Sequence, residues 1–310
     1  MKIIFMGTPT FAVPILDMLH ANYDVLMVVT QPDKPVGRKK ILTASPVKQR
    51  AQSLSIPLFQ PEKLKDDYRK LIDLDADLII TAAYGQMLPE ALLNHYKAIN
   101  VHGSLLPKYR GGAPIQYALF DGLKETGITI MYMVYKMDAG DIIKQESICI
   151  DDDDNYQTLS IRLSHIGAKL LHEVLELYKV NHSIEAIPQQ EDAVTFAKTL
   201  KPKDEIVSFH QSTDQVINRV RGLTPEPGAT AFIKNTPLKF FRVIKSDIIN
   251  DKAGAGTVLM CKKKLIIKTN DGAIEVLYIQ APGKNVMLAK DFLNGQNIMH
   301  EGDIFDEGSL

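Results

Sequence analysis

The alternation of short apolar runs with helix-length stretches constrains this chain more than any other feature of its sequence. Four apolar runs are bounded by turn residues: residues 2–6, 25–30, 77–82 and 98–101. Stretches long enough for helices lie between them, including residues 11–21 and 48–54. Uninterrupted apolar runs are typical of parallel strands that are covered on both faces. The alternation therefore predicts a Rossmann-like α/β domain with a mostly parallel sheet.

Two extended runs and one long amphipathic segment follow. Residues 127–134 and 142–150 are extended and could pair as a hairpin. The apolar positions after them recur every three or four residues: Leu159, Leu163, Ile166, Leu170, Val174 and Tyr178. This spacing places them on one face of a helix. We therefore expect one long helix to close the first domain.

The second half of the chain has a different pattern. Residues 188–206 are polar with little periodicity, which is typical of a linker. Beyond them lie one helical stretch, residues 213–222, and five β-like runs: residues 229–233, 238–243, 256–259, 265–269 and 275–280. Several short strands separated by turn signals predict a small β-barrel of the OB type. We therefore expect domains at residues 1–188 and 207–310, joined by a linker at residues 189–206.

Length, charge and cysteine content narrow the class of protein. A chain of 310 residues exceeds the size at which one hydrophobic core usually stops growing. Lys and Arg number 36 and Asp and Glu 37, which excludes a uniformly basic nucleic-acid binder but not a local basic patch. Cys149 and Cys261 stand alone, which disfavours disulfides and zinc sites and is typical of a reducing cytoplasm. No apolar run is long enough for a membrane helix, so no membrane partner is expected.

A glycine directly after the first apolar run raises the question of nucleotide binding. Gly7 stands at the first glycine of the dinucleotide-binding fingerprint, but Pro9 and Ala12 occupy the other two glycine positions. Pro9 also lacks the N–H that would face a pyrophosphate. The segment therefore predicts a tight strand-to-helix turn and argues against a Rossmann-type dehydrogenase.

The strongest chemical cluster follows the fourth apolar run, where the carboxyl end of a strand is expected. Open α/β sheets bind ligands at such ends. Asn100 and His102 are two residues apart, so on an extended backbone their side chains point to the same side. An amide donor beside a titratable ring suits stabilisation of an oxyanion and movement of a proton. Taken alone, Asn100 could also simply end the strand while His102 bonds a loop carbonyl.

The neighbouring residues favour the chemical interpretation. Gly103 permits close approach of the backbone to a ligand, and residues 105–107 offer an apolar wall. Residues 108–114 form a basic, glycine-rich segment of anion-binding character. Asp138 lies in a turn between the two extended runs. A carboxylate beside His102 would hold the imidazole in one tautomer.

Two segments together resemble the active-site signature of the folate-dependent formyltransferases. The first is residues 100–107, Asn-Val-His-Gly-Ser-Leu-Leu-Pro, and the second is residues 137–141, Met-Asp-Ala-Gly-Asp. The first turn, residues 7–14, is also similar to that of the family. The similarity extends along the whole chain to family members that formylate the methionine of initiator tRNA. It implies a formyltransferase domain followed by a β-barrel domain.

The resemblance also implies roles for particular residues. The implied catalytic residues are Asn100, His102 and Asp138. The implied folate contacts are Ser104, Leu105, Leu106 and Pro107, and the segment matching the pterin pocket is Gly85, Gln86, Met87 and Leu88. The implied donor is 10-formyltetrahydrofolate and the implied acceptor is the α-amine of initiator methionyl-tRNA, which becomes formylmethionyl-tRNA for translation initiation. No metal is needed, and a cytoplasmic monomer is expected.

A basic segment offers a place for the tRNA. Residues 31–50 contain six Lys and Arg and a single acid, Asp33. The plain interpretation is a solvated loop, whereas the resemblance implies a loop that enters the acceptor arm, with Arg38, Lys39 and Lys40 binding tRNA. Residues 204–290 also carry an excess of positive charge, while residues 291–310 are acidic.

Two alternatives stay open. A folate-dependent formyltransferase could act instead on the amine of a nucleotide or sugar nucleotide, although a barrel domain and a basic loop argue against it. An RNA-binding module that has lost catalysis is the other alternative. The intact set of Asn100, His102 and Asp138 argues against that module.

Overall fold

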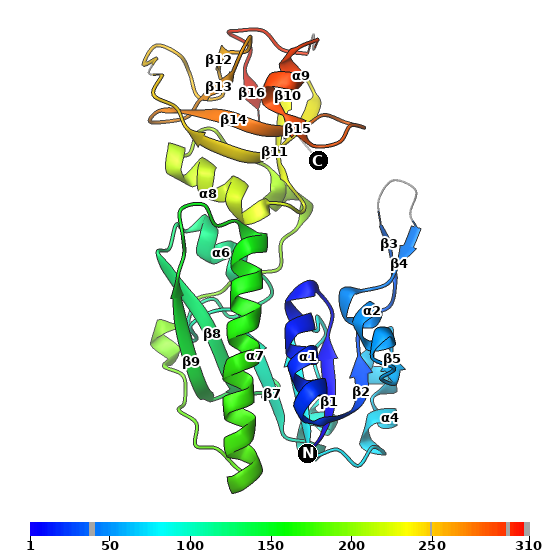
Figure 1. The fold of residues 1–310 in the computed structure, drawn as a ribbon. Coiled ribbons are helices and arrows are strands. Elements are labelled where there is room, and N and C mark those ends of the chain that lie inside the picture. Colours follow the sequence, from blue (N-terminus) through cyan, green and yellow to red (C-terminus); the bar gives the residue numbers. More distant parts are fainter. Residues whose placement is uncertain (37–40, 249, 296–297, 307–310) are drawn as a thin grey trace. The chain divides into compact units, whose positions relative to one another are not determined.

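The computed structural model describes residues 1–36, 41–248, 250–295 and 298–306 (Figure 1). Contacts between residues divide the chain into two compact units. The first unit consists of Met1–Pro114, Glu125–Cys149 and Ser160–Lys198, and the second of Ile115–Lys124, Ile150–Leu159 and Thr199–Leu310. The boundary between Lys198 and Thr199 lies inside the predicted linker, residues 189–206. The limits of the two predicted domains stay predictions.

The first unit is built on a sheet whose strands run mostly in parallel. Within the described ranges the strand order is β5, β2, β1, β6, β7, β8, β9 (Figure 1). Their bounds are Lys2–Gly7 (β1), Asp24–Val29 (β2), Leu58–Phe59 (β5), Leu78–Ala82 (β6), Ala98–His102 (β7), Glu125–Tyr132 (β8) and Ile142–Cys149 (β9). Neighbouring strands among β5, β2, β1, β6 and β7 pair in parallel, and β8 and β9 extend the sheet with antiparallel pairing. The Rossmann-like, mostly parallel sheet and the hairpin after it are confirmed.

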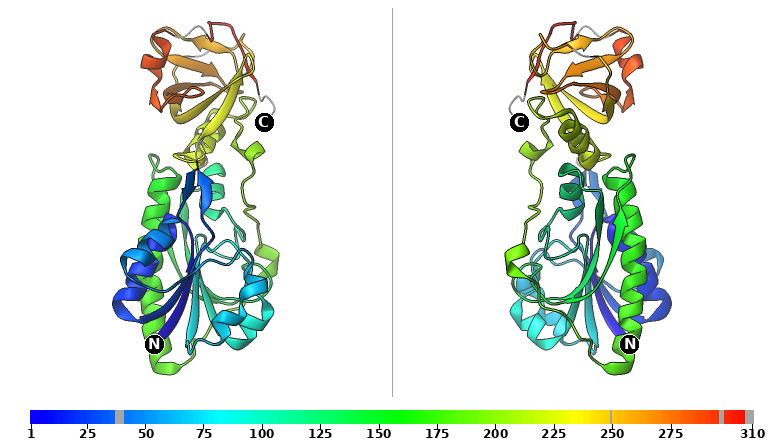
Figure 2. Two further views of the ribbon diagram at one scale, coloured as in Figure 1. Left: turned by 90° about the vertical axis from the view of Figure 1, so that its right-hand side faces the viewer. Right: turned by 90° about the vertical axis from the view of Figure 1, so that its left-hand side faces the viewer.

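Helices cover both faces of this sheet, as continuous apolar strands require. Their bounds are Thr10–Ala12 (η1), Val13–Asn22 (α1), Pro46–Ser53 (α2), Leu64–Asp67 (α3), Arg69–Ile72 (α4), Glu90–His95 (α5) and Tyr156–Asn181 (α7). Figure 2 shows α1 and α7 on one face and the short helices of residues 64–95 on the other. Every residue of β6 and β7 is buried, which agrees with this two-sided cover.

The long helix α7 packs directly on the middle of the sheet. Leu163, Leu170 and Val174 are buried, which confirms the amphipathic pattern. A Cβ at Gly167 would lie 2.9 Å from Val101 Cγ1, so the absence of a side chain lets the helix approach β7 closely. The helix therefore supports the strand that carries Asn100 and His102 from behind.

A small hairpin forms within the basic segment. Strands β3 (Lys34–Val36) and β4 (Ile41–Thr43) pair in antiparallel. Pro35 is tolerated because this ladder has only two strands, and a proline at an edge removes no needed donor. Sequence reasoning foresaw a loop without this pairing. Arg38, Lys39 and Lys40 lie outside the described residues.

The second unit is built on an antiparallel sheet that nearly closes into a barrel. Within its described part the strand order is β12, β13, β14, β11, β10, β16, with β15 also paired to β14. The strands are Ala229–Ile233 (β10), Thr236–Lys245 (β11), Val258–Met260 (β12), Leu265–Lys268 (β13), Ala273–Gln280 (β14), Met287–Leu288 (β15) and Phe305–Asp306 (β16). The helices are Pro114–Phe120 (α6), Thr213–Leu223 (α8) and Ala289–Leu293 (α9). The predicted barrel is confirmed, while β15, β16 and α9 were not foreseen.

The start of α8 shows how the sequence fixes a helix end. Ser212 Oγ accepts from the backbone N–H of Gln215, and Gln215 Oε1 accepts from the N–H of Ser212. This reciprocal capping box satisfies two donors that a helix start leaves unpaired. Val216 and Val220, one turn apart, then turn their side chains into the core of the second unit.

Residues 187–198, which we call the strap, lie along the first unit. Ile187 forms an antiparallel bridge with Ile142, and Phe196 forms a parallel bridge with Arg110. Between them lies the short turn Glu191–Ala193 (η2). The strap thus connects the β8–β9 hairpin with the loop after β7.

No helix within the described residues has the length and apolar character needed to cross a membrane.

Candidate active site

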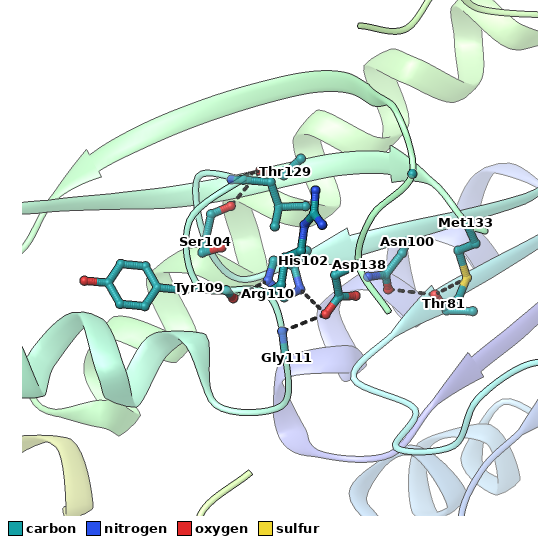
Figure 3. Close-up of polar contacts among 12 residues, drawn as sticks. Thr81, Asn100, His102, Ser104, Tyr109, Arg110, Gly111, Thr129, Met133 and Asp138 are labelled. Atoms are coloured by element: carbon teal, nitrogen blue, oxygen red, sulfur yellow. Dashed lines mark hydrogen bonds and ion pairs between the residues drawn. The ribbon is translucent and has the colours of Figure 1, made fainter. Parts of the chain in front are cut away.

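Asn100 and His102 lie at the carboxyl end of β7, where both side chains are almost fully buried. Thr81 Oγ1, from the neighbouring strand β6, is 2.7 Å from Asn100 Oδ1 and donates to it (Figure 3). The amide oxygen is thereby engaged, so the Nδ2 hydrogens are the donors that Asn100 can offer. Pairing of Thr81 with Asn100 in the parallel register of β6 and β7 brings these two side chains together.

The ring of His102 lies between a carbonyl oxygen and a carboxylate. His102 Nε2 is 3.0 Å from the backbone oxygen of Tyr109, and because a carbonyl only accepts, Nε2 carries the proton of this bond. His102 Nδ1 is 3.8 Å from Asp138 Oδ2, which is too long for a hydrogen bond and forms an ion pair only when both ring nitrogens carry protons. The bond to a loop carbonyl and the carboxylate contact, which sequence reasoning treated as alternatives, therefore occur together.

Asp138 is held in place by the loop after β7. Its Oδ2 accepts from the backbone N–H of Gly111 at 2.8 Å. Asp138 has φ 46°, a left-handed conformation that costs free energy and needs support from its surroundings. Gly111 has φ 125°, and a Cβ there would overlap the carbonyl oxygen of Ala197. Glycine is therefore needed where the loop meets both Asp138 and the strap.

The stretch expected to contact folate is tied into the protein by its own polar groups. Ser104 Oγ donates to Lys108 O, and Thr129 Oγ1 donates to Ser104 O and accepts from the N–H of Leu106. Ser104 and Leu106 are buried, whereas Leu105 and Pro107 are half-buried. Folate contact by residues 104–107 stays a prediction. In this conformation the side chains of Leu105 and Pro107 are the ones in this stretch that stay partly exposed.

The segment expected to line the pterin pocket borders a hollow of about 440 Å³. The residues around it are Lys63, Lys65, Gln86, Met87, Leu88, Pro89, Glu90 and Tyr135. Gln86 Oε1 accepts from the N–H of Leu64 at 2.7 Å, so this side chain holds the wall together. Gly85 has φ 88°, which reserves the turn before Gln86 for glycine. Tyr135 comes from the same loop as Asp138, which connects the hollow with the His102 cluster along the chain.

The basic segment uses some of its charge internally. Lys48 Nζ is 2.7 Å from Asp33 Oδ2, and Arg50 Nε is 2.6 Å from Asp17 Oδ1. The hydrogen bond from Lys48, assisted by one from Gln60, holds the pKa of Asp33 below its ordinary value. These two cations therefore contribute less to a phosphate-binding surface than the sequence count indicates.

Sequence reasoning missed the contacts that hold the cluster together. The guanidinium of Arg110 is 1% exposed, with Nε donating to Gln189 Oε1 at 2.9 Å and Nη2 to Glu191 Oε1 at 3.1 Å. The anion-binding character expected for residues 108–114 therefore does not extend to Arg110, whose charge is engaged inside the protein. Lys136, with a smaller contribution from Arg110, holds the pKa of Glu191 below its ordinary value.

Comparison with known proteins finds matches along most of the chain. Residues 1–175 match the "Formyl transferase" family, and residues 199–297 match its "Formyl transferase, C-terminal domain". A protein of Staphylococcus epidermidis named methionyl-tRNA formyltransferase is 50% identical over 301 residues, covering 95% of this chain and 96% of its own. One from Staphylococcus aureus strain bovine RF122, with the same name, is 48% identical over 307 residues, covering 96% and 97%.

Solved structures with low sequence identity share the fold. WlaRD, a sugar 3N-formyl transferase, superposes with a TM-score of 0.68 at 19% identity, over 92% of this chain and 99% of its own. HypX from Aquifex aeolicus, in complex with tetrahydrofolic acid, gives 0.67 at 17% identity over 94% of this chain and 47% of its own. Because both parts of the family match and about half of the residues are shared with full-length relatives, the chain belongs to the formyl transferase family.

Proposed function

We propose that this protein transfers the formyl group of 10-formyltetrahydrofolate to the α-amine of methionine on initiator tRNA. The product is formylmethionyl-tRNA, with which translation begins. The observation that carries the proposal is the identity of 48–50% with relatives named methionyl-tRNA formyltransferase, over 95–96% of the chain. The arrangement of Asn100, His102 and Asp138 supplies the chemical groups that this reaction needs.

The reaction forms one bond to the formyl carbon and breaks another. The donor supplies a formyl carbon bound to N10. When the amine attacks, negative charge develops on the formyl oxygen. Asn100 Nδ2 would donate to it, and His102 Nε2 would donate to it in place of its bond to Tyr109 O. The amine loses a proton and N10 gains one as its bond breaks, and His102 is the group that would relay this proton. Asp138 would stabilise His102 while the ring is charged.

The hollow beside Gln86 suits the donor. Met87, Leu88 and Tyr135 offer apolar surface for a ring system, and Lys63 and Lys65 offer positive charge for the carboxylates of a folate tail. We assign Gly85, Gln86, Met87 and Leu88, together with Ser104, Leu105, Leu106 and Pro107, to this donor site. Because the Gln86 side chain already bonds the backbone, its contribution is to hold the wall in shape.

The tRNA would bind through two basic regions. The first is Arg38, Lys39 and Lys40, between β3 and β4, which would contact phosphates of the acceptor arm. The second is the basic part of residues 204–290. In this assignment residues 1–188 carry the reaction, residues 189–206 form the linker and residues 207–310 contribute tRNA affinity. The protein would act as a monomer in the cytoplasm.

One observation supports a second candidate acceptor of the formyl group. The fold is shared with a sugar 3N-formyl transferase, so an amino sugar on a nucleotide is the competing substrate. The test incubates the purified protein with 10-formyltetrahydrofolate and one acceptor at a time. The acceptors are initiator methionyl-tRNA, uncharged initiator tRNA and a dTDP-linked amino sugar. Formylation of the aminoacylated tRNA alone is expected, and formylation of the amino sugar alone would establish the alternative.

A further inference from the structure

A glutamine in the strap joins the two loops that face His102. Gln189 precedes η2 and reaches across to both the β8–β9 loop and the loop after β7. We propose that Gln189 is a positioning residue for formyl transfer, which fixes Asp138 and the segment 109–111 at their places around the His102 ring. The inference rests on the function proposed above.

The hydrogen bonds of the Gln189 amide determine its orientation. Its Nε2 donates to the backbone oxygens of Asp138 at 2.8 Å and of Gly140 at 2.7 Å. Its Oε1 accepts from Arg110 Nε at 2.9 Å. Backbone oxygens only accept and a guanidinium only donates, so a flipped amide would lose all three bonds. The amide therefore fits these neighbours in one orientation.

The two loops that Gln189 joins are the ones that place acceptors at both nitrogens of His102. Tyr109 O faces Nε2 at 3.0 Å, and Asp138 Oδ2 faces Nδ1 at 3.8 Å. Arg110 lies between Tyr109 and Gly111, and the Gly111 N–H donates to Asp138 Oδ2. A shift of either loop would therefore change the contacts of His102. Gln189 resists such a shift because it holds both loops at once.

The partners of Gln189 are rigid enough to transmit this constraint. The Arg110 side chain is buried and also bonds Glu191. On the other loop, a Cβ at Gly140 would overlap the carbonyl group of Tyr132, so this turn packs tightly against β8. Two backbone hydrogen bonds between Ile187 and Ile142 fix the strap just before Gln189. The backbone before Gln189 is therefore fixed, and so are the two loops that its side chain binds.

The chain offers a matched control for testing this role. Gln189→Met keeps the length of the side chain and removes all three bonds, whereas Gln189→Glu keeps an acceptor for Arg110 but loses the donor to both backbone oxygens. Gln190→Met makes the same replacement at the exposed neighbouring position. Thermal unfolding of each variant establishes that it is folded before its kinetics are measured.

Both Gln189 variants are expected to lower kcat by about 10- to 100-fold, because displacement of about 1 Å away from the reacting atoms can cost about 100-fold. The KM values for donor and tRNA should change by no more than about twofold, since no binding group is removed. Gln190→Met should match the wild type. Equal kcat values for all three variants and the wild type would overturn the proposal.

A double variant separates positioning from a general structural role. Because Gln189 acts partly through Asp138, Gln189→Met should cause a smaller loss in the Asp138→Asn background than in the wild type. Losses that multiply in full would overturn the proposal. The imidazole signals of His102 in ¹⁵N NMR, assigned by their absence in His102→Ala, provide a readout without substrate. They should move in Gln189→Met toward their positions in Asp138→Asn, and unchanged signals would contradict the proposal. The wild-type turnover of initiator methionyl-tRNA tests the proposed function separately.

Discussion

At the scale of single residues, Thr81 determines which atom of Asn100 would act on a substrate in the proposed reaction. Its hydroxyl occupies the amide oxygen, and the amide hydrogens remain available to an oxygen that gains negative charge. Asn100→Ala and His102→Ala should each raise the activation free energy by about 3–4 kcal/mol, the usual cost of removing an oxyanion donor. Asp138→Asn should be nearly as damaging, because it keeps the shape of the side chain and removes its charge.

Single-turnover formylation at saturating substrates measures these losses. His165→Ala, which removes an exposed histidine on α7, is the matched control and should leave the rate unchanged. A normal rate for Asn100→Ala or His102→Ala would remove that residue from the mechanism. A normal rate for Asp138→Asn would reduce Asp138 to a turn residue.

Gly111 combines two requirements that no other residue type meets. Its φ of 125° is unfavourable for a side chain, and a Cβ would overlap Ala197 O. Gly111→Ala should therefore lower the free energy of unfolding by about 1–3 kcal/mol and, by moving the N–H away from Asp138, lower kcat as well. Gly254→Ala is the control, since nothing lies within 4 Å of its Cβ position. Denaturant unfolding and formylation rates check both effects, and equal stability of the two variants would contradict this account.

At the scale of elements, the first turn of α8 depends on the carboxylate of Asp271, which lies in the turn between β13 and β14. Asp271 Oδ1 accepts from the N–H of Thr213 at 2.7 Å and from its hydroxyl at 2.8 Å, and the backbone bond, the larger cause, holds the pKa of Asp271 below its ordinary value. A lowered pKa in the folded state means that the stabilisation is present above the unfolded-state pKa of about 3.9 and is lost as the pH falls through the folded-state value.

Asp271→Asn should therefore weaken the pH dependence of stability in the acid range. The amide oxygen can still accept a hydrogen bond but does not titrate, so the unfolding temperature should fall less steeply between pH 6 and pH 3 than in the wild type. Asp251→Asn replaces an exposed acid of the same unit and is the control. Parallel curves for the wild type and Asp271→Asn would show that the carboxylate does not stabilise this helix end.

Elements with a local apolar pattern could be predicted from the sequence, whereas contacts between distant residues could not. Strands β6 and β7 follow from local apolar runs, and α7 follows from its periodic apolar face, because burial imposes these patterns directly. The hairpin of β3 and β4 and the two-residue strand β16 have no such pattern. The contacts of Gln189 could not be predicted, because its partners lie 49, 51 and 79 residues away and no local pattern in the sequence reports them. The same holds for Tyr109 O, a backbone group that sequence does not distinguish.

At the scale of the whole molecule, a formal net charge of −1 conceals an uneven distribution. Residues 31–50 and 204–290 are basic, whereas residues 291–310 contain acids and no Lys or Arg. Within the first of these regions Lys48 and Arg50 are bound to Asp33 and Asp17. In the proposed function, attraction of tRNA to this region would therefore fall mainly to the remaining cations, Lys34, Arg38, Lys39 and Lys40.

Replacing Arg38, Lys39 and Lys40 by Ala should weaken the use of tRNA in a salt-dependent way. Each lost phosphate contact should reduce the log–log dependence of tRNA affinity on salt by about 0.7–0.9. The KM for tRNA should therefore rise most at low salt, while the KM for the donor stays unchanged. A fall in rate at saturating tRNA would show in addition that these residues orient the reacting amine. Formylation against tRNA concentration at several salt concentrations measures both quantities, with Lys169→Ala, an exposed lysine on α7, as the control. An unchanged salt dependence would place the tRNA elsewhere on the protein, because phosphate contacts cannot be lost without changing counterion release.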